Sequence, residues 1–153
     1  MPVHVIAGHL VIISAPISVL LALVYAGRPK ARAGMRWPLV VSTVLSFALA
    51  VWAEVLGSDL YQQLKEAGPA RAGAVAQAYL HAKSGDLLTV STLVLAVLVV
   101  VLVFWRLSPR RTATGGPHAL AAGLLVVAAL AVAWYTADTL ALAMQAVWSG
   151  VTP

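Results

Sequence analysis

Four long apolar runs dominate this sequence, at about residues 3–26, 38–57, 87–105 and 119–147. Each is close to or above the roughly 20 residues that an α-helix needs to cross the hydrocarbon core of a bilayer. Helices satisfy their own backbone hydrogen bonds where no water is present, and the runs are too long and too continuous for the strands of a membrane barrel. The sequence therefore predicts an all-α membrane protein, a single domain with four transmembrane helices.

Composition excludes several other classes of protein. Of the 153 residues, 61% are hydrophobic and 10% are charged, whereas a soluble domain is roughly 45–50% apolar and about 25% charged. The absence of cysteine excludes disulfides, thiolate-ligated metal clusters and thiol catalysis. The sequence also contains no GxSxG, HExxH, P-loop or GxGxxG motif, so we expect a binding or structural protein rather than an enzyme.

The basic residues predict the orientation of the helices. Two short linkers, residues 27–37 and 106–117, hold seven of the ten Lys and Arg residues, namely Arg28, Lys30, Arg32, Arg36, Arg106, Arg110 and Arg111. The positive-inside rule places such linkers in the cytoplasm, which leaves both termini and the linker at residues 58–85 outside. Short connections make consecutive helices antiparallel neighbours, so we expect an up-down-up-down bundle. Because the cations lie between apolar runs, nucleic-acid binding is not expected.

The outer linker has helical character of its own. Residues 70–82, ARAGAVAQAYLHA, have good helix propensity. They are expected to form either a separate outer helix or an extension of the third span, which would then begin near residue 71. A break is predicted at Ser84–Gly85, with Ser84 as the N-cap of the third span.

The two halves of the chain also resemble one another. Gly8-His9-Leu10 opens the first span and Gly85-Asp86-Leu87 opens the third, and each hairpin turns through a basic loop that ends in proline. We interpret this as a parallel internal repeat of two hairpins. If the repeat is real, a site is expected on the interior face between them.

One ionisable group lies near the outer end of each span. Counted from the basic residue or histidine at the cytoplasmic end of each helix, these groups are 19, 18, 20 and 20 residues away; they are His9, Glu54, Asp86 and Asp138. With a rise of about 1.5 Å per residue, all four fall within roughly 3 Å of one level. We call them the polar layer. Small and hydroxyl-bearing neighbours predict that Glu54 and Asp138 face the bundle interior.

Three chemistries fit the polar layer. Three carboxylates and one imidazole are suited to a divalent metal such as zinc, manganese or iron. Two histidines on different helices are suited to haem b, with His9 and His81 as the first pair considered, although their levels differ by about 9 Å. His4 and His81 match in level but lie at the bilayer edge, where His4 is expected to be a solvated terminal residue. The third chemistry is a proton or ion relay through the carboxylates.

Simpler explanations remain open for the same residues. Asp86 is also suited to the first turn of the third helix, where an acid interacts favourably with the helix dipole. Glu54 and Asp138 are also explained as interface residues in contact with water, and His9 as a hydrogen-bond partner of one of them. His118 is expected to cap the cytoplasmic end of the fourth helix. On these explanations the protein is an accessory subunit that packs against a larger membrane complex.

Three segments carry a family resemblance: GHLVIISAPISVLLALVYAG, HAKSGDLLTVSTLVLAVL and YTADTLALAMQAVW. Over nearly its whole length the chain resembles a bacterial family of small four-helix membrane proteins of unknown function, some fused to or encoded with Rieske-type iron–sulfur domains. The chain lacks the family's early His-Phe-Pro, and it has Ala137-Asp138 where members have Gly-His or Gly-Asp. The resemblance implies a bacterial plasma-membrane protein in a redox neighbourhood, with a membrane redox complex or a second copy of itself as partner.

Overall fold

The computed structural model describes residues 3–66, 72–108 and 115–148, and these form four α-helices and one short 3-10 helix. In chain order the elements are α1 (Val3–Gly27), η1 (Pro29–Ala31), α2 (Arg32–Glu66), α3 (Ala72–Phe104) and α4 (Gly116–Trp148). All four α-helices contain a segment long and apolar enough to cross a membrane. The prediction of an all-α, four-helix membrane protein is confirmed.

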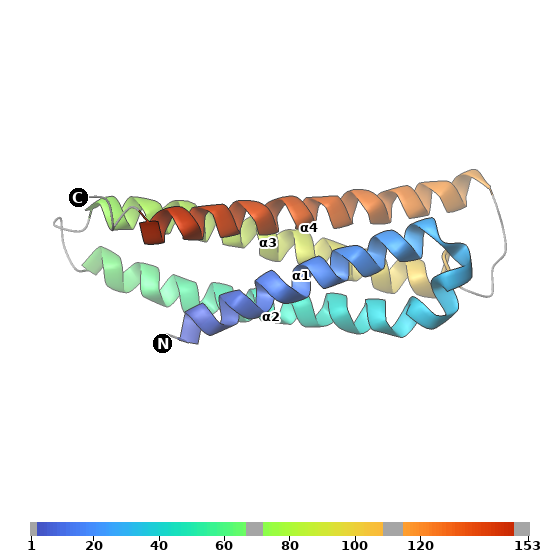
Figure 1. Cartoon of the computed structure of the whole chain (residues 1–153), viewed down its shortest axis with the longest axis horizontal. Helices are drawn as coiled ribbons and strands as arrows, with labels where there is room; N and C mark the ends of the chain where they lie inside the picture. The colour runs from blue at the N-terminus through green and yellow to red at the C-terminus, as the bar shows by residue number, and fades with distance from the viewer. Residues whose placement is uncertain (1–2, 67–71, 109–114, 149–153) are drawn as a thin grey trace.

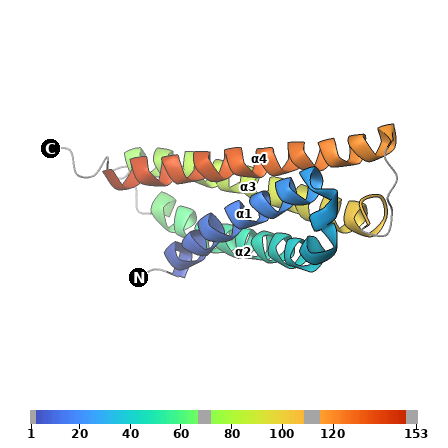
Figure 2. The same cartoon turned by 45° about the vertical axis from the view of Figure 1, so that its right-hand side comes forward.

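The helices lie side by side in an up-down-up-down bundle (Figure 1). The start of α1, the end of α2, the start of α3 and the end of α4 lie at one end, and the turn through η1 lies at the other (Figures 1 and 2). Each helix packs on two neighbours, since α1 and α3 both contact α2 and α4. α1 and α3 are therefore diagonal partners, and side chains that meet between them meet across the centre of the bundle.

The interior of the bundle is built largely from small side chains. Buried positions include many alanines and hydroxyl-bearing residues, among them Ser18, Thr43, Ser46, Ala50 and Thr136. Ser18 and Ser46 hydrogen-bond to one another across α1 and α2 at 2.8 Å. Small residues of this kind allow close helix contacts in membranes, while large apolar residues face the lipid.

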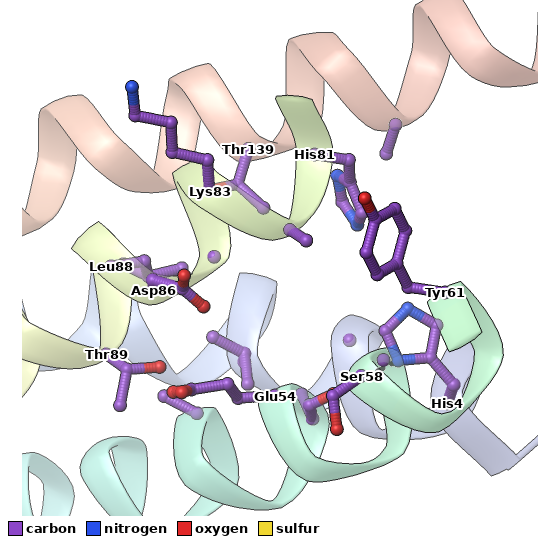
Figure 3. A pocket seen from close by; sticks show the side chains of 18 of the residues that line it. His4, Glu54, Ser58, Tyr61, His81, Lys83, Asp86, Leu88, Thr89 and Thr139 are labelled. Atoms are coloured by element: carbon purple, nitrogen blue, oxygen red, sulfur yellow. Dashed lines mark hydrogen bonds between the residues drawn. The ribbon is translucent and has the colours of Figure 1, made fainter. Parts of the chain in front are cut away.

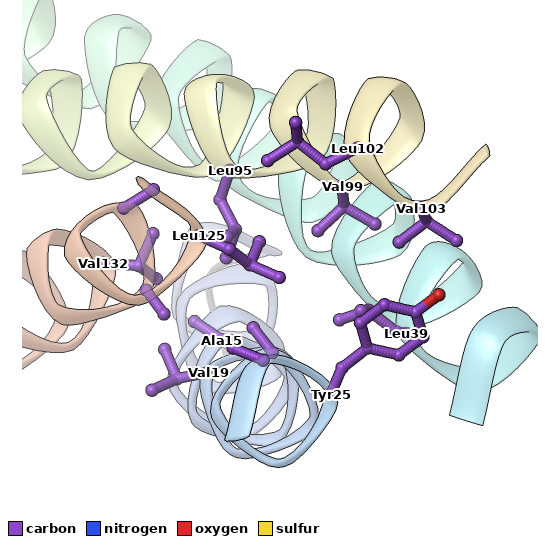
Figure 4. Packing of buried hydrophobic residues seen from close by; sticks show 14 of the residues in the cluster. Ala15, Val19, Tyr25, Leu39, Leu95, Val99, Leu102, Val103, Leu125 and Val132 are labelled. Carbon is purple, nitrogen blue, oxygen red and sulfur yellow. The ribbon is translucent and has the colours of Figure 1, made fainter. Parts of the chain in front are cut away.

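Larger side chains fill the half of the bundle near η1. Val99, Val103, Leu125 and Leu39 are almost completely buried there, together with the ring of Tyr25 (Figure 4). The outer surfaces of the same helices expose leucine, valine and isoleucine, including Ile13, Leu20, Val97 and Val127. This distribution is the one expected for a bundle whose solvent is a bilayer.

The helices extend further than the apolar runs. α1 has 25 residues, while α2 has 35 and α3 and α4 have 33 each. At about 1.5 Å per residue the three longer helices measure roughly 50 Å, compared with about 30 Å for the hydrocarbon core. α2 continues to Glu66 although its apolar run ends at Gly57, so residues 58–66 of the outer linker extend the second span. α3 begins at Ala72, so residues 72–85 of the linker extend the third span, as one of the two alternatives predicted.

The predicted break at Ser84–Gly85 is wrong, because α3 is continuous there. Ser84 does not act as an N-cap. Its hydroxyl Oγ lies 2.6 Å from Asp138 Oδ2, to which it donates, and 2.9 Å from the Thr139 hydroxyl, both on α4. Asp86 consequently lies well inside α3, which excludes its explanation as a first-turn acid.

A hydrogen-bonded cluster ties the helices together at the η1 end. The guanidinium of Arg32, which is 3% exposed, donates to the carbonyls of Tyr25 and Ala26 at 3.0 and 3.2 Å, where α1 ends and its last carbonyls lack helical partners. A third nitrogen of the same group donates to Nε2 of His118. The Tyr25 hydroxyl donates to the Leu107 carbonyl at 2.9 Å. His118 was expected to cap its own helix, but its ring instead joins α4 to α2.

Candidate functional site

A cavity of about 680 Å³ lies among the helices near the start of α1. Its walls come mainly from α1, α2 and α3, with Thr139 and Ala143 from α4. The space remains open because many of the lining residues are small; they include Gly8, Ala50, Ala53, Gly57, Ala78, Ala82 and Gly85. The cavity lies at the end of the bundle opposite the basic loops, on the side where the polar layer was predicted.

Two imidazoles meet across this cavity. The rings of His4 on α1 and His81 on α3 have centroids 6.2 Å apart and are nearly perpendicular, at 87°. Both line the cavity, as Figure 3 shows. Because α1 and α3 are diagonal in the bundle, the pair bridges its interior.

The His4 ring is held in place by α2. Its Nδ1 lies 3.1 Å from the Ala53 carbonyl, and since a carbonyl only accepts, Nδ1 is the donor of this hydrogen bond and the acceptor of the neutral ring is then Nε2. Gly57 provides the space for the ring, because a Cβ at that position would lie 2.9 Å from His4 Cε1. The expectation that His4 is a solvated terminal residue is therefore wrong.

His81 has an unsatisfied nitrogen. Its Nδ1 is buried and makes no hydrogen bond of good geometry to the residues that the structure describes, although the Thr139 backbone lies near the ring. A buried polar atom without a partner is uncommon in proteins and calls for an explanation such as a ligand. The hydroxyl-bearing side chains of Ser58 and Tyr61 line the same end of the cavity (Figure 3).

Two carboxylates of the polar layer also line the cavity. Glu54 on α2 and Asp86 on α3 point into the space between their helices, while the Lys83 side chain extends away from it (Figure 3). The cavity therefore carries acidic as well as imidazole groups. Glu54, Asp86 and Asp138 are all exposed, so the prediction that Glu54 and Asp138 face the bundle interior is not confirmed.

The other two members of the polar layer have different partners. His9 borders the cavity, but it is exposed and its Nδ1 lies 2.7 Å from the Val5 carbonyl of its own helix. Asp138 is bound by Ser84. Within residues 3–66, 72–108 and 115–148, no three His, Asp or Glu side chains are close enough to hold a metal ion together. Metal binding by His9, Glu54, Asp86 and Asp138 thus stays a prediction.

The two histidines that meet in the structure are not the pair that the sequence analysis considered first for haem. The sequence paired His9 with His81, whereas the imidazole beside His81 is that of His4. The matching levels of His4 and His81 were the sequence signal for this contact. Their position at the bilayer edge argued against the pair, but the extension of α2 and α3 beyond α1 supplies protein walls around it.

Comparison with known proteins adds no identification. The chain matches no model of a known family, and comparisons with curated proteins and with solved structures find no significant similarity.

Proposed function

We propose that this protein is an integral membrane component that binds haem b through His4 and His81. The observation that carries the proposal is the pair of imidazoles on diagonally opposite helices, 6.2 Å apart across a cavity. Two histidines from different helices that meet at a cavity could hold a haem between them, and His4 and His81 are the imidazoles that this bundle brings together.

The environment of His4 supports the same role. A ligating histidine almost always donates its other ring nitrogen to a carboxylate, a backbone carbonyl or water, which fixes the tautomer and the orientation of the ring. His4 makes this contact with the Ala53 carbonyl. The imidazole is thus oriented by α2 and by the space at Gly57.

Haem fits the donor set better than a bare ion does. The imidazole pair supplies two ligands, and no described group of three His, Asp or Glu side chains adds a third. A haem would be held by His4 and His81 alone, and the volume of about 680 Å³ lies within the roughly 300–1,000 Å³ of small-molecule and cofactor sites. With two histidine ligands, the group would supply electron transfer, in agreement with the redox neighbourhood that the family resemblance implies.

Purification in mild detergent from membranes of cells supplied with haem precursor tests the proposal. We expect a Soret band that shifts on reduction, and iron in a one-to-one ratio with the chain. His81→Ala should lose both signals, while His118→Ala, a matched substitution at the opposite end of the bundle, should keep them.

Two other results would favour other functions. Stoichiometric zinc or manganese without a Soret band would indicate a bare metal site. Neither haem nor metal, in wild-type protein that melts cooperatively, would favour an accessory subunit in which the polar groups join helices.

A further inference from the structure

The charges of this chain are segregated between its two ends. Its five acidic residues are Glu54, Asp59, Glu66, Asp86 and Asp138, and residues 1–53 and 87–137 contain no Asp or Glu. At the opposite, η1 end, the described residues include five cations, Arg28, Lys30, Arg32, Arg36 and Arg106. No acidic side chain of this protein is therefore available to balance them.

Two of these cations lie on an aromatic surface. The guanidinium of Arg36 on α2 is 4.2 Å from the centroid of the Phe104 ring and 5.6 Å from that of Trp37. The guanidinium of Arg106 is 5.0 Å from the Trp105 ring, and the Trp37 and Phe104 rings touch edge to face at 5.8 Å. We call these five residues the stacked-arginine face.

Stacking leaves the hydrogen-bonding capacity of a guanidinium unused, because its donors lie in the plane of the group. Nε of Arg36 is buried and has no partner among the residues that the structure describes. Arg32, by contrast, is engaged by two carbonyls and by His118. The Arg36 guanidinium is therefore held in place by aromatic rings while its Nε lacks a hydrogen-bond partner among the described residues. The Arg32 guanidinium, in contrast, uses its hydrogen bonds to join helices of the bundle.

The rings indicate the depth at which this face lies. Trp37 is 60% exposed, Trp105 57% and Phe104 43%, and exposed tryptophans at the ends of spanning helices lie at the level of the lipid headgroups. A guanidinium held there faces phosphates, whose geometry its fixed donors match. The exposed apolar surface of α3 continues from this level through Val101 and Val97, alongside which acyl chains would pack.

We propose that the stacked-arginine face binds the phosphate of anionic phospholipids. A lipid is favoured over a free anion because the face combines cations with exposed rings and continues into an apolar helix surface. The negatively charged headgroups would balance the cations near η1, because the acidic residues of the chain lie at the other end of the bundle. The inference is independent of the haem proposal, which concerns the opposite end of the bundle.

Lipid retention tests the proposal. The full chain is placed in nanodiscs of equal parts phosphatidylglycerol and phosphatidylcholine, released into detergent, and analysed by native mass spectrometry. We expect retained phosphatidylglycerol to exceed phosphatidylcholine, and Arg36→Gln to lower that preference about fivefold, the effect of roughly one cation near an anionic membrane. Arg28→Gln, which removes the same charge from an exposed position, should lower it less than twofold.

Three results would overturn the proposal: equal retention of the two lipids, an equal loss in Arg28→Gln, or displacement of the lipid by millimolar inorganic phosphate. The last would indicate a free-anion site. Arg36→Lys keeps the charge but loses the planar group, so it should also lose most of the preference. Cooperative melting of each variant in phosphatidylcholine alone establishes that it is folded.

Discussion

The His4 imidazole packs directly against Gly57. A Cβ at position 57 would lie 2.9 Å from Cε1 of the imidazole, and the ring also hydrogen-bonds to the Ala53 carbonyl. Gly57→Ala should therefore displace the ring and lower haem affinity about tenfold, since overpacking costs about 1–3 kcal/mol. Titration of the apoprotein with haem measures the change.

Gly8→Ala is the matched control for this substitution. Gly8 borders the same cavity, but a Cβ at that position would meet nothing within 4 Å. Its haem affinity should stay within twofold of wild type. Equal affinities in the Gly57 and Gly8 variants would contradict the role given to the His4 ring.

The Tyr25 hydroxyl is expected to stabilise the η1 end of the bundle. Tyr25→Phe removes its hydrogen bond to the Leu107 carbonyl, which is buried, and should lower the free energy of unfolding by about 1 kcal/mol. Unfolding in mixed detergent micelles measures this loss. Tyr79→Phe, whose ring is half exposed, should change stability much less, and a similar loss in both variants would argue against the contact.

Counting residues along each helix predicted the depth of a side chain along the bundle better than the direction in which that side chain points. The rise per residue is fixed, so the sequence placed Glu54 and Asp86 at the level where both line the cavity. Rotation about a helix depends on packing and on local bonds. His9 hydrogen-bonds to the Val5 carbonyl of its own helix, and Asp138 accepts a hydrogen bond from Ser84. The spacing of these residues in the sequence could not predict either contact.

At the scale of the elements, the continuity of α3 through Gly85 gives a direct test. A Cβ at Gly85 would meet nothing within 4 Å, and glycine inside a helix is less favourable than alanine by about 0.5–1 kcal/mol. Gly85→Ala should therefore raise the melting temperature, more than Gly73→Ala does in the first turn of α3. A lower melting temperature would instead indicate the chain break that the sequence suggested.

Apolar runs predict spans but not complete helices. A run ends where polar residues begin, so the sequence ended the second span at Gly57 although α2 continues to Glu66. Most of the residues that extend α2 beyond Gly57 are polar, so a hydropathy criterion cannot detect that the helix continues. These extensions of α2 and α3 matter for function, because they form walls of the cavity around His4 and His81.

At the scale of the whole molecule, the seven cations in the two short linkers of the sequence predict a cytoplasmic location for the η1 end. The chain has no cysteine, so single cysteines at Ala33 and Gly68 can be labelled separately. An impermeant maleimide applied to intact cells should label Gly68→Cys, and Ala33→Cys should react only after permeabilisation. The opposite pattern would reverse the orientation and would place the stacked-arginine face in the outer leaflet.

The two ends of the bundle thus differ in chemistry. One end combines small side chains, two imidazoles and carboxylates around a cavity, and the other combines buried aliphatic residues with cations and rings. The fold followed from the sequence because four apolar runs leave few alternatives. The pairing of His4 with His81 could not be predicted from the sequence, because it depends on how α1 and α3 are rotated about their axes and on the space at Gly57.

The haem content of two single variants tests the central claim most directly. His4 and His9 lie five residues apart on α1 and both border the cavity, but only His4 contacts the His81 ring. When both variants are purified alongside wild type, His4→Ala should lose at least nine-tenths of the Soret absorbance per chain and His9→Ala should retain most of it. Retention in His4→Ala with loss in His9→Ala would contradict the account.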